Sequence, residues 1–153
     1  MNWKRLVLFL FVNFGALALG GLFTGAGVSS DWYQNINQAP WTPPGWMFGA
    51  AWTFIMICFA FFMTYAWQVS KDKSMLLTLF VVQWILNVAW NPVFFYLREV
   101  LLGLIVITAL TILVWYLLFK FRNELRGKSL LMLPYAIWLA IATSLNAFIY
   151  LNN

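Results

Sequence analysis

Five long apolar stretches, separated by polar segments, constrain the fold of this chain more than any other feature of its sequence. They run over residues 6–27, 46–67, 75–96, 100–121 and 129–151. Each has about 22 residues, which at about 1.5 Å per residue crosses a hydrocarbon core of roughly 30 Å. With 64% hydrophobic and 8% charged residues, the chain has too little polar surface for a small water-soluble domain. We therefore predict an all-α integral membrane bundle of five transmembrane helices, forming one domain over residues 1–153.

The basic residues predict how this bundle sits in the membrane, because Lys and Arg in short loops stay on the cytoplasmic side. Eight of the nine lie before the first stretch, between the second and third, or from the end of the fourth to the start of the fifth: Lys4, Arg5, Lys71, Lys73, Lys120, Arg122, Arg126 and Lys128. Only Arg98 lies on the other side. We predict the N-terminus inside and the C-terminus outside, in a bacterial plasma membrane. The net charge of +5 is dispersed over short loops, so we expect no nucleic-acid partner.

Ionisable residues are missing from the interior of the predicted spans. Asp31, Asp72, Glu99 and Glu124 all fall at or near span ends, which leaves no buried proton relay and no catalytic carboxylate pair. The chain has no His, and the single Cys58 cannot form an intrachain disulfide. We therefore expect no metal site and no cofactor. A site in this bundle must be built from aromatic faces, amides and hydroxyls.

The loop over residues 28–45 is the one long connection between predicted spans. It combines three prolines with aromatic residues, among them Trp32, Tyr33 and Pro43. Proline lowers the entropy that a loop loses on ordering, and Trp and Tyr suit the membrane interface. Two interpretations stay open at this point: an aromatic belt with a rigid turn, or a folded lid over the mouth of the bundle.

The third predicted span carries a polar and aromatic stripe. Gln83, Asn87, Trp90 and Phe94 follow at spacings that place them within about 60° of one another around the helix. Amides are costly in lipid unless they face neighbouring helices, so this stripe should point inward. The amides either make interhelical hydrogen bonds or contact a ligand.

The other spans suggest where space could remain. Trp138 in the fifth span is followed one turn later by the small Ala142, with Leu145 and Asn146 beyond it. Trp52, Trp90 and Trp138 lie on three different spans and make an aromatic-lined cavity for a flat ligand plausible. In the first span, Gly21 and Gly25 stand in the spacing that lets another helix approach closely. Glycines there could also leave room for a ligand.

Three ordered motifs give the chain a specific resemblance to a known family. The first comprises Trp32-Tyr33, Pro40-Trp41, Pro43-Pro44-Gly45-Trp46 and Trp52. The second comprises Gln83, Asn87, Trp90 and Pro92-Val93-Phe94-Phe95. The third comprises Pro134-Tyr135, Trp138, Ala142-Thr143 and Leu145-Asn146. Over nearly its whole length the chain resembles the translocator protein family, also called tryptophan-rich sensory proteins or peripheral-type benzodiazepine receptors.

The resemblance implies a five-helix bundle, often a homodimer, with a pocket that the first loop closes. Such pockets bind porphyrins and aromatic drugs of the isoquinoline-carboxamide and benzodiazepine types. By position, the pocket would use Trp52, Gln83, Asn87, Trp90, Trp138, Ala142 and Leu145, and the lid would use Trp32, Tyr33 and Pro43. Cholesterol, a ligand ascribed to animal members, is a weaker expectation, because their pattern needs Lys or Arg after the tyrosine and Tyr150 is followed by Leu151, Asn152 and Asn153.

We therefore predict a membrane receptor that binds a flat hydrophobic ligand, most naturally a porphyrin, inside the bundle. The ligand would stack on Trp52, Trp90 or Trp138, with Gln83 and Asn87 fixing its orientation and with Phe94 and Asn146 nearby. A second hypothesis is light-dependent porphyrin breakdown, which the resemblance associates with Trp52 and Trp138 in some bacterial members. Two further hypotheses are that the protein transports a substrate across the membrane, or that it is a regulatory partner that converts no substrate.

Overall fold

Helices make up almost the whole chain in the computed structural model, which describes residues 1–153 and has no strand. The α-helices are α1 (Trp3–Val28), α2 (Asp31–Asn35), α3 (Gly45–Val69), α4 (Lys73–Asn91), α5 (Val100–Leu125) and α6 (Leu133–Asn152). Two segments of other helix types join them: η1 (Pro92–Tyr96) is π-helical, and η2 (Arg126–Met132) is a 3₁₀-helix.

Short polar side chains cap several of these helices. The side chain of Asn2 accepts a hydrogen bond from the backbone N–H of Arg5 at the start of α1. Asp72 does the same for Met75 at the start of α4, at 2.8 Å. Each cap satisfies a backbone donor that the first turn of a helix leaves free. The caps therefore fix where α1 and α4 begin at one end of the bundle.

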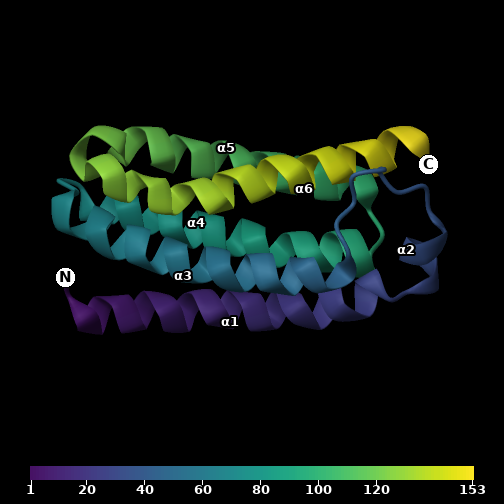
Figure 1. Ribbon diagram of the computed structural model, residues 1–153, viewed down its shortest axis with the longest axis horizontal. Coiled ribbons are helices and arrows are strands. Elements are labelled where there is room, and N and C mark those ends of the chain that lie inside the picture. The colour runs from purple at the N-terminus through teal and green to yellow at the C-terminus, as the bar shows by residue number, and fades with distance from the viewer.

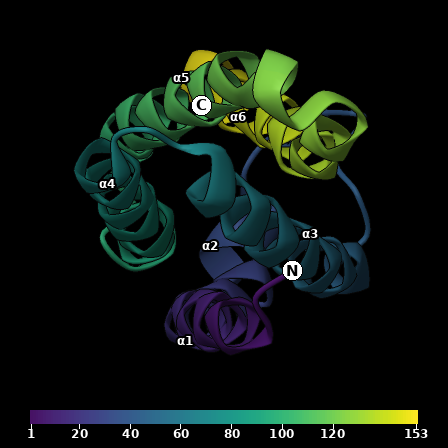
Figure 2. The same ribbon diagram turned by 90° about the vertical axis from the view of Figure 1, so that its left-hand side faces the viewer.

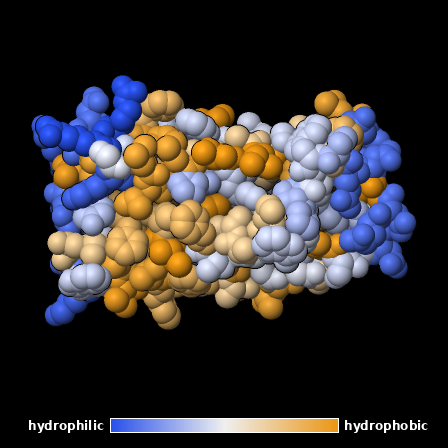
Figure 3. All heavy atoms as spheres, viewed as in Figure 1, coloured by the Kyte–Doolittle hydropathy of each residue, from blue (hydrophilic) through white to orange (hydrophobic).

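The long helices run roughly parallel to one axis (Figures 1 and 2). α1 packs against α3 and α4, while α5 packs against α4 and α6. The N- and C-termini lie at opposite ends of the bundle, and the loop with α2 covers the end near the C-terminus (Figure 1). Hydrophilic residues gather at the two ends, with mostly hydrophobic residues between them (Figure 3).

Four helical runs are long and apolar enough to cross a membrane: Trp3–Val28, Gly45–Val69, Lys73–Tyr96 and Val100–Asn152. The last run has 53 residues. At about 1.5 Å per residue, a straight helix of that length would far exceed a hydrocarbon core of about 30 Å. Instead, the chain doubles back at η2, so that α5 and α6 lie side by side (Figure 1).

The third and fifth apolar stretches are not the continuous α-helices that the sequence predicts. α4 ends at Asn91, and the next turn is π-helical, with the backbone N–H of Leu97 donating to the Pro92 carbonyl at 2.9 Å. Pro92 has no N–H to give to the α-helical ladder, which explains why the helix changes type there. The predicted span from residue 129 begins as the 3₁₀ segment η2, and α6 starts only at Leu133.

The core of the bundle lies between α3, α4, α5 and α6. Its fully buried side chains include Phe59, Phe62, Leu117, Tyr135 and Leu139. α1 sits at the edge of this core and leaves large apolar side chains such as Phe11 and Leu22 exposed. An apolar outer surface of this kind is what a lipid environment requires.

Candidate functional site

The amides of the predicted stripe on α4 meet a tyrosine of α6. The Tyr135 hydroxyl donates a hydrogen bond to Oε1 of Gln83 at 2.6 Å. In turn, Nδ2 of Asn87 donates to the same hydroxyl at 2.9 Å. All three side chains are buried. This chain of hydrogen bonds gives each of the three buried side chains a polar partner and ties α4 to α6.

A second polar link lies nearer the end covered by the loop. Nε1 of Trp90 donates to Oδ1 of Asn146 at 3.0 Å, and Nδ2 of Asn146 donates to the Val100 carbonyl at 2.9 Å. The Trp90 ring stacks on Phe94, with centroids 5.1 Å apart and planes 14° apart. The structure therefore brings together three residues of the predicted site: Trp90, Phe94 and Asn146. Trp90 contacts the other two.

The two other tryptophans of the predicted site lie in different surroundings. Trp52 is half-buried and packs against Tyr135 in a T-shaped arrangement, with ring centroids 5.7 Å apart. Trp138 is buried and meets Phe48 at 5.6 Å, and its indole Nε1 has no hydrogen-bond partner. Ala142 and Leu145 are buried in the same hydrophobic core as Trp138.

The loop between α1 and α3 is folded onto the end of the bundle. Tyr33 of α2 packs against Phe94 and Phe95 of η1, and Trp32 packs against Phe94 at a centroid distance of 5.6 Å. Burial raises the pKa of the Tyr33 phenol by desolvation. Pro43 is partly buried in the same loop. These contacts place two of the predicted lid residues, Trp32 and Tyr33, against η1, which follows α4.

Further along the loop, hydrogen bonds attach it to α6. Nε1 of Trp41 donates to Oγ of Ser144 at 3.0 Å. The side chain of Asn37 donates to the Asn152 carbonyl at 2.9 Å, and the Asn153 side chain accepts from and donates to the Asn37 backbone, at its N–H and its carbonyl respectively. The loop is thus fixed to the bundle at both η1 and α6.

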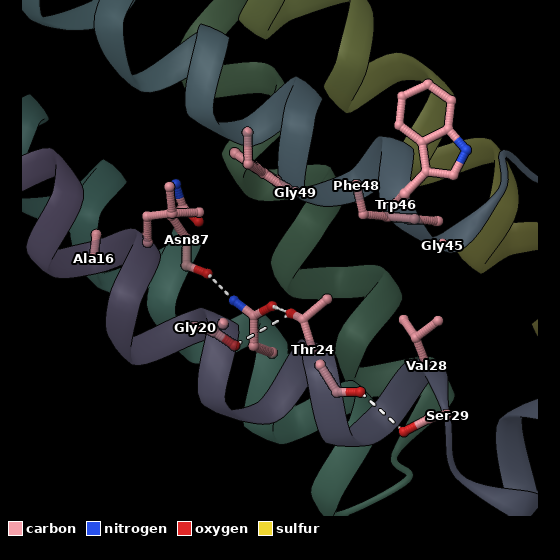
Figure 4. Close-up of a pocket in the computed structure, with 15 residues that line it drawn as sticks. Ala16, Gly20, Thr24, Val28, Ser29, Gly45, Trp46, Phe48, Gly49 and Asn87 are labelled. Carbon is pink, nitrogen blue, oxygen red and sulfur yellow. Dashed lines mark hydrogen bonds between the residues drawn. The ribbon is translucent and has the colours of Figure 1, made fainter.

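A cleft of about 410 Å³ lies beside this region, between α1 and α3, with α4 at its floor (Figure 4). Its α1 wall includes Ala16, Gly20, Gly21, Thr24, Gly25 and Val28. Its α3 wall includes Gly45, Trp46, Phe48, Gly49 and Trp52, and its floor is formed by Asn87 and Asn91. From Ala16 to Val28 the cleft extends about 18 Å along α1 at 1.5 Å per residue.

Glycines keep this cleft open toward the outside of the bundle. Gly21, Gly25 and Gly49 are exposed, and a Cβ atom built on any of them would meet no heavy atom within 4 Å. No charged residue lines the cleft. The cleft therefore opens sideways on the apolar surface, where in a membrane protein lipid is the neighbouring solvent.

Hydrogen bonds join the α1 wall of the cleft to its floor. The Thr24 hydroxyl hydrogen-bonds to Oδ1 of Asn91, and Nδ2 of Asn91 donates to the Asn87 carbonyl at 3.0 Å (Figure 4). Gly20 is tightly packed here, because a Cβ atom on it would stand 2.6 Å from Nδ2 of Asn91. Close approach of α1 to α4 thus depends on this glycine.

Comparison with known proteins places the sequence in a family. A model of the TspO/MBR family matches residues 6–151 of the chain. The chain belongs to the TspO/MBR family. It is 34% identical to the tryptophan-rich protein TspO of Archaeoglobus fulgidus, over 100% of this chain and 99% of that protein. It is also 30% identical to the tryptophan-rich sensory protein of Cereibacter sphaeroides, over 95% and 89% of the two chains. Identity to the human translocator protein is 27%, over 87% and 83%.

The resemblance drawn from the three motifs is confirmed by these matches. In this member of the TspO/MBR family, Trp52 and Asn87 are the predicted site residues that line the cleft between α1 and α3. The packing of α4, η1 and α6 holds Gln83, Trp90, Phe94, Trp138, Ala142, Leu145 and Asn146. Trp32 and Tyr33 lie in the loop and pack against η1. The structure thus separates the predicted set into a cleft wall, a packed core and a cover.

Sequence reasoning did not include some residues that shape the cleft. Asn91 was absent from the predicted site, although it follows Asn87 by one helical turn and an amide in a span needs a partner. Thr24 and Gly49 were also absent. The glycines of the first span do point to the cleft, because space for a ligand is one of the two interpretations of Gly21 and Gly25.

Proposed function

We propose that this protein is a membrane-embedded binding protein for flat hydrophobic ligands, with porphyrins as the ligand class, and that the cleft between α1 and α3 is its binding site. The observation that supports this most strongly is an uncharged cleft of about 410 Å³ that opens sideways and is walled by glycines and Trp52. Its volume falls in the range of about 300 to 1,000 Å³ that is usual for small-molecule sites.

The shape and chemistry of the cleft favour a flat aromatic ligand. Glycine faces on both walls present backbone rather than side chains, so a planar ring can approach both helices closely. Trp52 offers an aromatic face to one edge of such a ring. Asn87 and Asn91 on the floor supply amide groups that can fix orientation by hydrogen bonding. Drugs of the isoquinoline-carboxamide and benzodiazepine types share this planar aromatic character and are proposed as competitors.

The proposal includes the placement of the chain in the membrane. α1, α3, α4 with η1, α5 and α6 would each cross once, with the basic end of the bundle on the cytoplasmic side of a bacterial plasma membrane. Supporting this, the N-terminus and the α3–α4 and α5–α6 connections lie at one end of the bundle (Figure 1), and eight of the nine Lys and Arg residues belong to them. The ligand would enter the cleft from the lipid.

The loop with α2 would act as the cover of the site. Val28 and Ser29 at its start and Gly45 and Trp46 at its end both line the cleft. Any displacement of the loop therefore changes the shape of the cleft at its outer end. The contacts of Tyr33 with η1 and of Trp41 with α6 would hold the cover in place over a bound ligand.

Titration of protoporphyrin IX into the detergent-solubilised protein in the dark, followed by quenching of tryptophan fluorescence, tests this function. We expect saturable one-site quenching. Trp52→Phe should weaken it, because Trp52 lines the cleft, whereas Trp138→Phe should have a smaller effect, because Phe48 contacts Trp138 and lies on the cleft side. Linear quenching shared by all three proteins would mean that porphyrin only partitions into the micelle, which contradicts the proposal.

A further inference from the structure

A second hollow, of about 570 Å³, lies at the opposite end of the bundle from the loop. It is formed where α3 ends and where the chain turns from α5 into η2. Its lining includes Tyr65 and Gln68 from the last turns of α3, and Arg126 and Lys128 from η2. This is the end at which the hydrophilic residues of the α5–α6 connection gather (Figure 3). The hollow is separate from the cleft between α1 and α3.

The cationic side chains of this hollow have no anionic partner in the protein. Neither Arg126 nor Lys128 forms an ion pair, although the carboxylate of Glu124 is part of the same lining. The Lys128 ammonium instead lies 4.2 Å from the centroid of the Tyr65 ring. With one carboxylate against two cations, the lining has a net charge of +1. An anion bound here would meet cations whose charge is not already neutralised.

Arg126 reaches this position through an unfavourable backbone conformation. It caps α5 with φ 50° and ψ −124°, a region that glycine enters without strain and other residues rarely adopt. A glycine is the next residue in the chain, Gly127. The strained backbone conformation therefore belongs to Arg126 and not to Gly127, and the exposed side chain of Arg126 lines the hollow. An arginine offers two parallel N–H donors to a phosphate, which glycine cannot.

The surroundings of the hollow match the depth of lipid headgroups. Tyr116 and Phe119 of α5 are exposed, and each has a cation over its ring: Lys120 at 5.7 Å and Arg122 at 6.0 Å from the centroid. Aromatic rings with basic groups above them are typical of the boundary between hydrocarbon and headgroups. Val69 and Leu125 give the hollow an apolar side as well. A free phosphate would leave that apolar side without a partner.

From these observations we infer that the hollow binds the phosphate of an anionic phospholipid headgroup. The guanidinium of Arg126 donates to the phosphate oxygens, the ammonium of Lys128 supplies a second positive charge, and the Gln68 amide is placed to donate to the headgroup. Basic pockets between membrane helices recognise anionic lipids by this chemistry. The inference rests on the proposed placement of this end at the membrane surface, and it does not depend on which ligand occupies the cleft.

Native mass spectrometry of the purified full chain, released from detergent micelles holding equal amounts of phosphatidylglycerol and phosphatidylcholine, tests the inference. We expect one retained phosphatidylglycerol. Arg126→Gly and Lys128→Gln should each lower its occupancy relative to phosphatidylcholine by about fivefold, the effect of one basic charge near a membrane surface. Lys4→Gln is the matched control, because it removes a charge from the same end of the bundle but outside the hollow.

Thermal unfolding in lipid-free detergent keeps the test independent of folding. Arg126→Gly relieves the backbone strain, so its Tm should equal or exceed that of the wild type while lipid retention falls, a combination that a purely structural arginine would not produce. Equal loss of lipid in Lys4→Gln, or wild-type retention in both hollow variants, would overturn the inference. Displacement of the lipid by millimolar inorganic phosphate would overturn the lipid source and assign the site to free phosphate. The porphyrin titration of Arg126→Gly should be unchanged, because Arg126 does not line the cleft. Loss of lipid binding can therefore be told apart from loss of porphyrin binding.

Discussion

Gly20 of α1 faces Asn91 of α4 so closely that a Cβ atom on the glycine would stand 2.6 Å from Nδ2 of the asparagine. Asn91 is buried and holds hydrogen bonds to Thr24 and to the Asn87 carbonyl. It therefore cannot move away without breaking polar contacts in an apolar span. The pair fixes the distance between α1 and α4, and with it the floor of the cleft.

Replacing this glycine should destabilise the bundle. We expect Gly20→Ala to cost about 1 to 3 kcal/mol, because it overpacks a rigid contact. Gly15→Ala is the control: it is exposed on the same helix, has nothing within 4 Å of its Cβ position, and should be neutral or slightly stabilising. Unfolding in a graded denaturing detergent measures both. Equal stability of the two variants would mean that α1 is not held against Asn91.

The tyrosine hydroxyl in the core should be a large local contributor to stability. Tyr135→Phe removes the group that bonds both Gln83 and Asn87, and it leaves two buried amides without that partner. We expect a loss of about 1 to 3 kcal/mol in the free energy of unfolding. A double-mutant cycle with Gln83→Met should show coupling, since the second change removes an amide that the first leaves unpaired. Additive losses would contradict the hydrogen-bonded link between α4 and α6.

The hydrogen bonds between the loop and α6 should control how firmly the cover is closed. Asn37→Ala removes a side-chain bond to the Asn152 carbonyl, whereas Asn35→Ala removes a bond within the loop, to the Asp31 carbonyl. We expect Asn37→Ala to raise amide hydrogen exchange over residues 36–42 and to speed porphyrin dissociation. Asn35→Ala should leave dissociation unchanged. Identical dissociation rates in the two variants would show that the cover does not act through α6.

The buried phenol of Tyr33 predicts a response to alkaline pH. Its pKa is raised in the folded loop, so the folded state keeps the proton more tightly than the unfolded chain does. The buried, protonated phenol therefore makes its full contribution to folding stability below the ordinary tyrosine pKa of about 10. That contribution is lost as the pH rises from there through the raised pKa of the folded state. We expect Tm to fall less steeply above pH 10 in Tyr33→Phe than in the wild type. Parallel curves would show that the phenol is not buried against η1.

The apolar pattern of the sequence predicts the helices well, because spans are set by length and hydropathy. The basic segment between the fourth and fifth apolar stretches does predict the reversal of the chain there, which the structure places at η2. The pattern could not predict the π-helical turn after Asn91 or the 3₁₀ form of η2, since both depend on how Pro92 and Arg126 are accommodated by neighbouring helices. The stripe of Gln83, Asn87, Trp90 and Phe94 does face the bundle, with three of its members buried and Trp90 half-buried.

The position of the cleft was harder to predict than its composition. Aromatic residues at Trp52, Trp90 and Trp138 indicated a cavity between the second, third and fifth spans, but Trp90 and Trp138 contact neighbouring aromatic rings. Space remains beside α1, where glycines remove side-chain volume. Whether a glycine leaves a gap or makes a tight contact depends on the facing helix. The space beside Gly20 is occupied by Asn91, whereas Gly21 faces open space. A single sequence does not contain that information.

Filling the cleft tests the central claim most directly. Gly49→Leu places a side chain into the open space beside Trp52, and Gly15→Leu adds the same side chain to an exposed position outside the cleft. The affinity of each variant for protoporphyrin IX is then measured by titration in the dark, with Tm as the check on folding. The account predicts at least about a tenfold weaker Kd in Gly49→Leu, since a filled cleft excludes the ring, and a wild-type Kd in Gly15→Leu. A wild-type Kd in a folded Gly49→Leu protein would contradict the cleft between α1 and α3 as the binding site.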